Sequence, residues 1–196
     1  MLEDGYHDVP AHKIVAIVTS LQMVEQPERR AEVAGPWELV RHQKLALDAY
    51  RALYRKLGAE WLWFSRLAMP DDELASNIHA PQVELYVLDV GGVAEGLLEL
   101  DFRKDGECEL VFFGVSAALI GTGAGRWLMN RAIENAWCHP IRRFWLHTCT
   151  LDSPQALPFY MRSGFLPYER RVEVADDPRL SGHAPREAAP SLPIIE

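Results

Sequence analysis

The sequence predicts a single domain of the α/β class, built on a mixed, mostly antiparallel sheet. Two observations carry this prediction. Glycine-containing turns separate three apolar runs between residues 83 and 115, a pattern typical of an antiparallel meander. The hydrophobic period then changes to that of a helix over residues 124–137. With 196 residues, 48% of them hydrophobic, the chain has enough apolar surface to bury one core.

The first half of the chain predicts one strand and two helices. Residues 13–19 are apolar and rich in β-branched side chains, which favours a strand. Residues 37–57 carry apolar side chains at helical spacing before Gly58, which predicts an amphipathic helix. The aromatic run at residues 61–64 either lines a pocket or fills the core, and core packing is the more frequent fate of such residues. Acidic residues directly after a proline predict a short helix over residues 70–77.

The second half of the chain predicts a meander and then alternating helices and strands. Glycine-containing turns divide the meander, and glycine or proline follows both helices. We expect strands at residues 83–90, 93–102, 107–115, 143–150 and 165–174, and helices at residues 124–137 and 154–162. Residues 1–175 are expected to form the domain, and residues 176–196, rich in proline, alanine and charge, a loosely packed tail.

The composition argues against several classes of protein. The formal net charge is −8 and the basic residues do not cluster, so we expect no nucleic-acid partner. Cys108, Cys138 and Cys149 stand at spacings that fit neither a disulfide framework nor a zinc site, so we expect no metal and a reducing, cytoplasmic location. The start of the chain is acidic and the longest uncharged stretch is broken by glycines, so we expect no membrane association.

A glycine-rich segment between a predicted strand and a predicted helix is the strongest local signal for a ligand. Glycines at 121, 123 and 125 allow backbone N–H groups to turn toward an anion at the N-terminus of the helix, where the helix dipole also favours negative charge. The segment is not a dinucleotide fingerprint, because Arg126 stands where the third glycine belongs, and it lacks the lysine of a Walker loop. A tight turn without a ligand is the alternative.

Two motifs resemble those of the GCN5-related N-acetyltransferases. Residues 109–126 are similar to the central motif of that family, in which a strand precedes a loop of pattern Arg/Gln-x-x-Gly-x-Gly/Ala. Residues 153–165 are similar to its second signature, Asn-x-x-Ala-x-x-x-Tyr-x-x-x-Gly-Phe. The chain departs from the family at Ile120, where arginine or glutamine is usual, and at Ser153, where asparagine is usual. These departures put the affinity for the cofactor in doubt more than the fold.

The resemblance implies the fold of this family, a mixed, mostly antiparallel central sheet of six to seven strands with helices on both faces. It also implies an acetyl-coenzyme A-dependent transfer to a primary amine of a small molecule or peptide, by direct attack in a ternary complex. The resemblance also allows a homodimer, because members of the family often dimerise. The positions that match the cofactor-binding motifs are Phe113, Gly114, Val115, Ile120, Gly121, Thr122, Gly123, Ala124, Gly125, Arg126, Ser153 and Ala156.

Two residues are the candidate catalytic groups. Glu109 lies on the strand before the loop, among apolar neighbours that can desolvate it, and matches the general base of the histone-acetylating branch of the family. Glu99 and Asp101 are rivals for this task, although an exposed sheet edge is the more frequent setting for such residues. Tyr160 stands at the tyrosine position of the family and can protonate the departing thiolate. Backbone N–H groups near Gly114 can polarise the thioester carbonyl if the strand bulges there.

Three alternative interpretations stand beside this one. His147 and Cys149 share one face of a predicted strand, but a satisfied, buried histidine is the favoured interpretation because no third group is evident that could orient the imidazole. A non-catalytic module that binds acyl-coenzyme A is the main alternative function, supported by the departures at Ile120 and Ser153. A nicotinamide oxidoreductase would need a parallel strand–helix–strand unit around Gly121, which the hairpin pattern contradicts.

Overall fold

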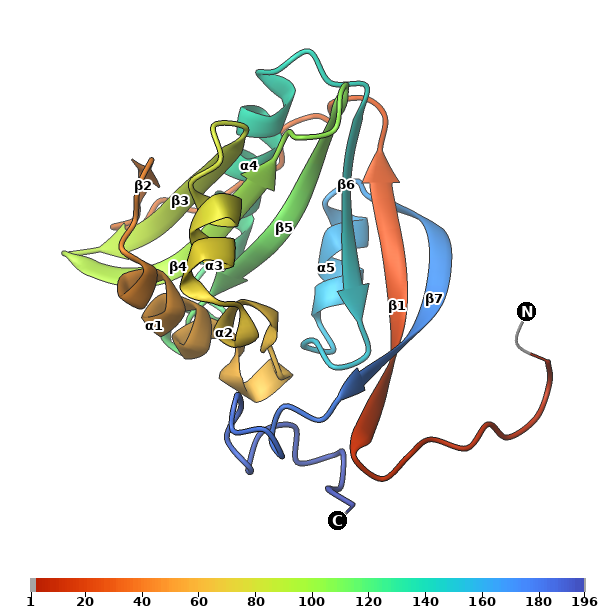
Figure 1. The fold of residues 1–196 in the computed structure, drawn as a ribbon. Coiled ribbons are helices and arrows are strands. Elements are labelled where there is room, and N and C mark those ends of the chain that lie inside the picture. Colours follow the sequence, from red (N-terminus) through yellow and green to blue (C-terminus); the bar gives the residue numbers. More distant parts are fainter. Residues whose placement is uncertain (1–2, 196) are drawn as a thin grey trace.

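The computed structural model describes residues 3–195 and contains one seven-stranded sheet (Figure 1). The strands lie in the order β2-β3-β4-β5-β6-β1-β7. They are β1 (Lys13–Met23), β2 (Glu38–His42), β3 (Val83–Val90), β4 (Val93–Asp101), β5 (Glu107–Val115), β6 (Arg143–Cys149) and β7 (Leu166–Asp176). The helices are α1 (Leu47–Gly58), α2 (Ser65–Ala68), α3 (Asp71–Ile78), α4 (Ala124–Trp137) and α5 (Ala156–Arg162), with short 3₁₀ turns at Ala59–Trp61 and Ala117–Leu119.

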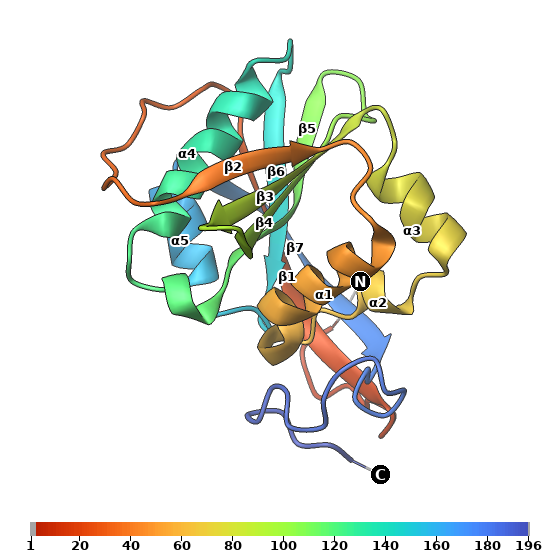
Figure 2. The same cartoon turned by 90° about the vertical axis from the view of Figure 1, so that its left-hand side faces the viewer.

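Helices cover both faces of the sheet, as the sequence predicts (Figure 2). On one face α4 and α5 pack over a core that includes Leu128, Phe144 and Phe165. On the other face α1 and α3 enclose a second core around Tyr50 and Leu74. Each strand between the two layers can bury both sides, which explains why six consecutive residues of β3 and six of β4 are buried. In residues 3–195 no helix is long and apolar enough to span a membrane.

The sheet opens between β5 and β6, which are the only parallel neighbours within residues 3–195. Their pairing is limited to the register from Glu107 opposite Arg143 to Glu109 opposite Trp145. All other strand pairs are antiparallel. Figure 1 shows β5 and β6 meeting at one end and diverging toward the other. The edge of β5 beyond Glu109 is therefore left without a strand partner on the β6 side, which leaves backbone polar groups free for a ligand.

The predicted helix over residues 37–57 is wrong over residues 37–46. Glu38–His42 forms the edge strand β2, which pairs antiparallel with β3, and the helix begins only at Leu47. Val40 lies opposite Val87 in this pairing. The short apolar sequence fits either period, and hydrogen bonding to an exposed strand edge decides the outcome.

Part of the tail is packed, in contrast to the expected loose tail. The guanidinium of Arg179 is almost fully buried, pairs with Asp177, and donates from Nη1 to the carbonyl oxygens of Ala188 (3.1 Å) and Leu192 (2.7 Å). Alanines at 184, 188 and 189 form a small core with Ile14 and Leu62. Alanine-rich sequence offers little apolar area, so this packing depends on the buried ion pair, which the sequence pattern does not reveal. The domain boundary near residue 175 stays a prediction.

Candidate active site

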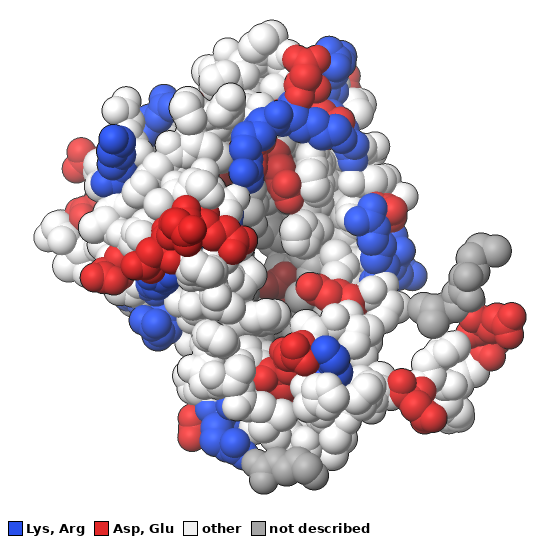
Figure 3. Space-filling model, in the orientation of Figure 1, with Lys and Arg blue, Asp and Glu red and all other residues white. Residues whose placement is uncertain are grey.

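A cavity of about 350 Å³ lies where β5 and β6 part. Its walls come from the segment that follows α1, from β5 and β6, and from α5. Figure 3 shows this face of the molecule hollowed between the helical layer and β6, with acidic side chains in and around the hollow. The volume is typical of a small-molecule site. The aromatic lining residues are Tyr54, Trp61, Trp63, Phe64, Phe112, Phe113 and Tyr160, and the polar ones are Ser65, Arg66, His147, Cys149, Asp152 and Glu173.

Glu109 and His147 form an ion pair at the opening of the sheet. Oε1 of Glu109 lies 3.5 Å from Nδ1 of His147, which is two residues beyond the last β6 position paired with β5. His147 lines the cavity, whereas Glu109 is not among the cavity residues within the described chain. The hydrogen bond to Glu109 raises the pKa of His147, and partial burial opposes the shift. A carboxylate that orients an imidazole at a cavity wall is an arrangement suited to proton transfer.

The structure corrects the sequence interpretation of His147. The side chain is 51% exposed rather than buried, and Glu109 is the orienting group that sequence reasoning did not find. The alternation along β6 places His147 and Cys149 on one face, as expected. Burial raises the pKa of the Cys149 thiol to about 11, so the thiol is protonated at neutral pH. A nucleophilic cysteine is therefore not supported.

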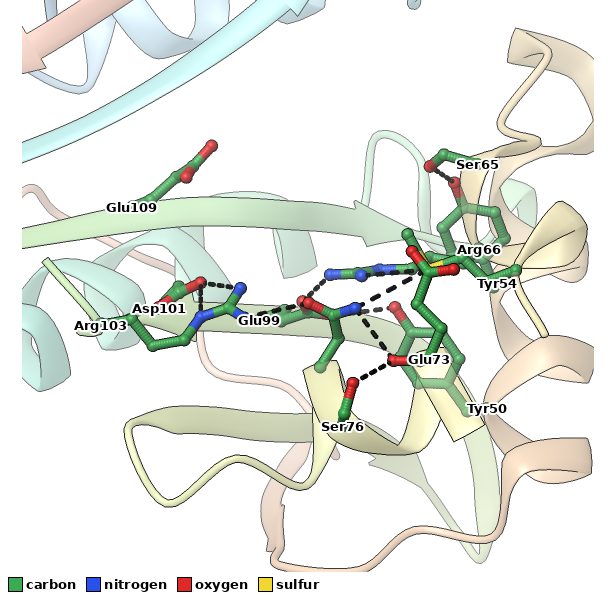
Figure 4. A network of polar contacts seen from close by, with 12 residues as sticks. Tyr50, Tyr54, Ser65, Arg66, Glu73, Ser76, Glu99, Asp101, Arg103 and Glu109 are labelled. Carbon is green, nitrogen blue, oxygen red and sulfur yellow. Dashed lines mark hydrogen bonds and ion pairs between the residues drawn. The ribbon is translucent and has the colours of Figure 1, made fainter. Parts of the chain in front are cut away.

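Glu99 and Asp101 lie in a separate polar network and not on an exposed edge. Glu99 is 1% exposed, pairs with Arg66 and accepts a hydrogen bond from the Tyr50 hydroxyl at 2.7 Å. Asp101 pairs with Arg103. Figure 4 shows both carboxylates tied into this network, whereas Glu109 projects from the neighbouring strand without a partner among the residues drawn.

Burial raises the pKa of Glu99, and Arg66 and Tyr50 oppose this shift. Both of its oxygens are engaged, one by Arg66 and the other by Tyr50. Taking up a substrate proton would break a buried ion pair, which is costly. Glu99 is therefore a poor candidate for the general base.

Tyr160 lies on α5 and lines the cavity from the side opposite the helical layer. Its ring packs against Phe113 and Phe165, each at a centroid distance of 6.2 Å. Burial raises the pKa of its hydroxyl, so the group stays protonated at neutral pH. Within residues 3–195 that hydroxyl has no hydrogen-bond partner, which leaves it available as a donor.

The glycine-rich segment before α4 presents unpaired amides, in agreement with an anion site. Gly121 and Gly123 adopt positive φ angles of 80° and 97°, a backbone conformation that glycine permits. Within the described chain, no acceptor is found for the N–H groups of residues 121, 123, 125 and 126. The Thr122 hydroxyl donates to the Leu119 carbonyl and accepts from the Ala124 N–H, which fixes the turn. Free amides at the start of a fourteen-residue helix favour a bound phosphate.

Side chains around this segment add positive charge, and Val33 packs against Gly123 while the space beside the two neighbouring glycines is open. A Cβ atom at position 121 or 125 would meet nothing within 4 Å, so the space beside these glycines is open. Ile120 is 68% exposed and contributes no polar group. Arg126 donates to the Ser163 hydroxyl, and burial together with Arg30 and Arg162 lowers its pKa. Among the described residues, no carboxylate pairs with any of these three arginines, so an anionic ligand would be favoured there.

The remaining predicted cofactor positions lie around the same opening. Phe113 lines the cavity, and Gly114 and Val115 end β5 still paired with β4. The expected bulge at residues 113–115 is wrong in position, because the irregularity in the β4–β5 pairing falls beside residue 111. Ala156 begins α5, and the Ser153 carbonyl accepts the N–H of Ala156 at 2.8 Å. Ser153 thus helps to start this helix, and its contact with a cofactor stays a prediction.

The aromatic run at residues 61–64 serves both purposes that the sequence left open. Residues 61–64 all line the cavity, and Trp63 also packs against the core around Tyr50 while Leu62 enters the small core with the tail. The indole N–H of Trp63 donates to Asp152 at 3.2 Å, which links the helical side of the cavity to the turn after β6. Sequence reasoning missed Asp152, although an acidic residue directly after a strand that ends near a predicted cavity is a usable signal.

A mixed sheet that opens between two parallel strands, with a glycine-rich loop leading into a covering helix, is the architecture of an acetyltransferase of the GCN5-related type. The chain belongs to the Acetyltransferase (GNAT) family, whose model matches residues 48–165, more than half of the sequence. The resemblance seen in the two motifs is therefore confirmed. No curated protein matches the sequence.

Solved structures share this fold at low sequence identity. A functionally unknown conserved protein from Staphylococcus epidermidis has a TM-score of 0.57 and 14% identity, and the match covers 84% of this chain and 63% of that one. A GCN5-related N-acetyltransferase from Sphaerobacter thermophilus has a TM-score of 0.60 and 13% identity, covering 83% and 52%. The IAA acetyltransferase from Bacillus cereus has a TM-score of 0.51 and 20% identity, covering 67% and 79%. The matches thus span less than two thirds of the first two structures.

Proposed function

We propose that the protein is an N-acetyltransferase that uses acetyl-coenzyme A to acetylate a primary amine of a small molecule or peptide, by direct attack in a ternary complex. One observation carries the proposal: the opening between β5 and β6 forms a cavity lined by both His147, which pairs with Glu109, and Tyr160. Amine acetylation needs one group that removes a proton from nitrogen and one that protonates the departing sulfur. The cavity contains a candidate for each.

The residues before and along α4 fit the anionic end of the cofactor. The free amides of residues 121, 123, 125 and 126 suit a diphosphate, and Arg126, Arg30 and Arg162 suit its negative charge. The unpaired edge of β5 beyond Glu109 suits the extended arm that joins the diphosphate to the thioester. When bound, acetyl-coenzyme A supplies an acetyl group activated as a thioester.

Proton removal is assigned to the Glu109–His147 pair. A protonated alkyl amine, with a pKa near that of lysine at about 10.4, has no free lone pair for attack. His147 accepts this proton at the cavity wall, and Glu109 orients the imidazole and stabilises its charged form. The role of Glu109 therefore changes from the expected direct base to a positioning residue that acts through His147.

Completion of the transfer is assigned to Tyr160 and to the edge of β5. As the nitrogen–carbon bond forms, the carbonyl oxygen gains negative charge, which backbone N–H groups beside the opening stabilise. When the carbon–sulfur bond breaks, the Tyr160 hydroxyl would donate its proton to the sulfur, and the resulting phenolate would take the second proton of the attacking nitrogen, which restores the hydroxyl and leaves the neutral amide. A protonated, unpartnered hydroxyl is suited to this donation.

Calorimetric titration with acetyl-coenzyme A, followed by a thiol-release assay over a panel of amines, tests the proposal. We expect saturable binding and amine-dependent release of coenzyme A. The exposed Ile120 favours one competing function, a module that binds acyl-coenzyme A without turnover. Binding with no thiol release for any amine would support that module, and absence of binding would refute both.

A further inference from the structure

We infer that the acceptor is a small primary amine with one cationic head and an apolar, preferably aromatic, body. The inference rests on the proposed function, because it concerns the second substrate of the same cavity. Three properties of the cavity carry it: an aromatic wall, a negative charge balance and a side-chain bridge that limits access.

The aromatic wall lies on the helical side of the cavity. Tyr54, Trp63 and Phe112 pack on one another with ring centroids 4.9–5.4 Å apart. This mutual packing holds the wall in place, so an apolar ligand can bind without first ordering it. Trp61 and Phe64 also line the cavity, and in the described chain neither ring stacks on another aromatic ring. Both side chains are partly exposed, so they can contact an apolar body in the cavity.

The charges that line the cavity leave a negative balance. Arg66 is paired with Glu99, so its charge is neutralised within the protein. His147 is likewise paired with Glu109. Two further carboxylates line the cavity, those of Asp152 and Glu173. A cavity of this charge concentrates cations and repels acceptors that carry a carboxylate.

The two remaining carboxylates are held differently. Asp152 accepts hydrogen bonds from the Trp63 indole, the Thr148 hydroxyl (2.7 Å) and the Cys149 N–H (2.9 Å), which fixes its position. The Glu173 carboxylate makes no ion pair or hydrogen bond with other residues in the range 3–195. Its charge acts on His147 across the cavity and can act on a ligand there as well. An ammonium group between the aromatic wall and these carboxylates would gain both a counter-charge and favourable contact with the rings.

The bond between Trp63 and Asp152 also limits the size of the acceptor. It joins the two sides of the opening at 3.2 Å, and the volume left inside is about 350 Å³. A peptide chain would have to part this bridge. A polyhydroxylated or multiply charged amine would place polar groups against the aromatic wall without hydrogen-bond partners, which is unfavourable. An arylalkylamine satisfies the wall, the charge and the volume together.

Steady-state kinetics with phenethylamine, spermidine, glucosamine and a lysine-containing peptide tests the inference at saturating acetyl-coenzyme A. We expect kcat/KM for phenethylamine to exceed that of each other amine by about tenfold or more. Preference for any of the other three would overturn the inference while leaving the proposed function intact.

Two cavity variants with matched controls test the residues involved. Trp61→Ala removes an apolar wall residue and is expected to raise KM for phenethylamine about tenfold. Its control is Tyr168→Ala, which removes an exposed aromatic side chain outside the cavity and is expected to leave KM unchanged.

Glu173→Gln is expected to raise KM for phenethylamine about threefold at low salt and less at high salt. Glu169→Gln, on the same strand but outside the cavity, is its control. Unaltered KM values in both cavity variants would contradict the inference.

Equilibrium dialysis of phenethylamine against the protein with coenzyme A separates failure of the inference from failure of the proposed function. Binding that Trp61→Ala weakens, without thiol release for any amine, would refute the transferase and retain the cavity's preference for an arylalkylamine. Absence of phenethylamine binding would overturn that preference whatever the activity.

Discussion

Nδ1 of His147 lies 3.5 Å from Oε1 of Glu109, and this contact spans the opening between β5 and β6. The two residues come from strands that are paired only at one end, so the imidazole faces the cavity while the carboxylate holds it from the neighbouring strand. His147 lines a cavity because the pairing of β5 and β6 stops here; continued pairing of the two strands would close this space.

The pH dependence of the reaction is predicted to follow this pair. The hydrogen bond to Glu109 raises the pKa of His147 above its ordinary value of 6.5. Since the neutral imidazole is the proton acceptor, we expect kcat/KM for the amine to rise with pH through a midpoint above that value. Asp152 and Glu173 also stabilise the charged imidazole. Rate profiles between about pH 5 and 9 provide the measurement.

Replacing Glu109 by glutamine is predicted to lower the maximal rate and to shift the profile. Without the carboxylate the pKa of His147 falls, so the midpoint moves to lower pH, and we expect the rate to fall about tenfold to a hundredfold. Affinity for acetyl-coenzyme A, measured by calorimetry, is the control and stays unchanged. An unaltered rate and midpoint would exclude the Glu109–His147 pair as the proton acceptor.

Tyr160→Phe is predicted to slow thiol release about tenfold to a hundredfold without unfolding the protein. The phenylalanine ring keeps the contacts with Phe113 and Phe165, and only the donor hydroxyl is lost. Stopped-flow detection of the free thiol measures the effect, and thermal unfolding checks the fold. If release keeps its normal rate, Tyr160 has only a packing role.

Ile120→Arg is predicted to tighten binding of acetyl-coenzyme A about tenfold, because a charge-assisted hydrogen bond to phosphate contributes roughly 1.5–3 kcal/mol. Ile120 is 68% exposed, so the substitution removes little packing. Val93→Arg, at the exposed start of β4, adds the same charge elsewhere and serves as the control. Equal affinities in the two variants would argue against a phosphate site at this loop.

Arg179→Met is predicted to destabilise the tail, because it removes the ion pair of the buried Asp177 with Arg179 and leaves two carbonyl oxygens without that donor. Breaking a buried pair costs about 3–5 kcal/mol. Limited proteolysis within residues 176–195 and denaturant unfolding measure the two consequences. If the tail resists protease equally in Arg179→Met and in the parent protein, Arg179 does not hold the tail in place.

Asp177 also predicts how stability responds to acid. Arg179 lowers the pKa of Asp177 below its ordinary value of 3.8. A group whose pKa is lower in the folded state stabilises the protein above its unfolded pKa, and this contribution is lost as the pH falls through the folded value. We therefore expect a loss of stability below about pH 4 that is smaller in Arg179→Met than in the parent protein. Urea unfolding at pH 7 and at pH 3 provides the comparison.

The pair of Arg66 and Glu99 is predicted to behave as a unit. Glu99→Leu or Arg66→Met alone leaves one buried charge unpaired and is expected to cost about 3–5 kcal/mol. The double variant Glu99→Leu, Arg66→Met removes both charges, so its cost is expected to be less than the sum. A double-mutant cycle in urea measures the coupling, and additive costs would rule it out.

Much of the fold was determined by local sequence. The meander of β3, β4 and β5 follows from turn residues between apolar runs, and α4 follows from its helical period. The glycines at 121 and 123 likewise predict backbone conformations that other residues rarely adopt. These features depend on neighbours within a few positions, so a single sequence contains the information.

Tertiary structure decided the edge strand, the packing of the tail and the candidate site, because these features depend on contacts between residues far apart in the sequence. The edge strand β2 exists only because β3 offers free hydrogen-bonding groups, and the tail is held by Arg179. The candidate site has the same origin: Trp63 meets Asp152 across 89 positions, and Glu109 meets His147 where two strands part. Periodicity along one chain cannot specify such pairs, since each side chain's role depends on the partner that folding brings to it.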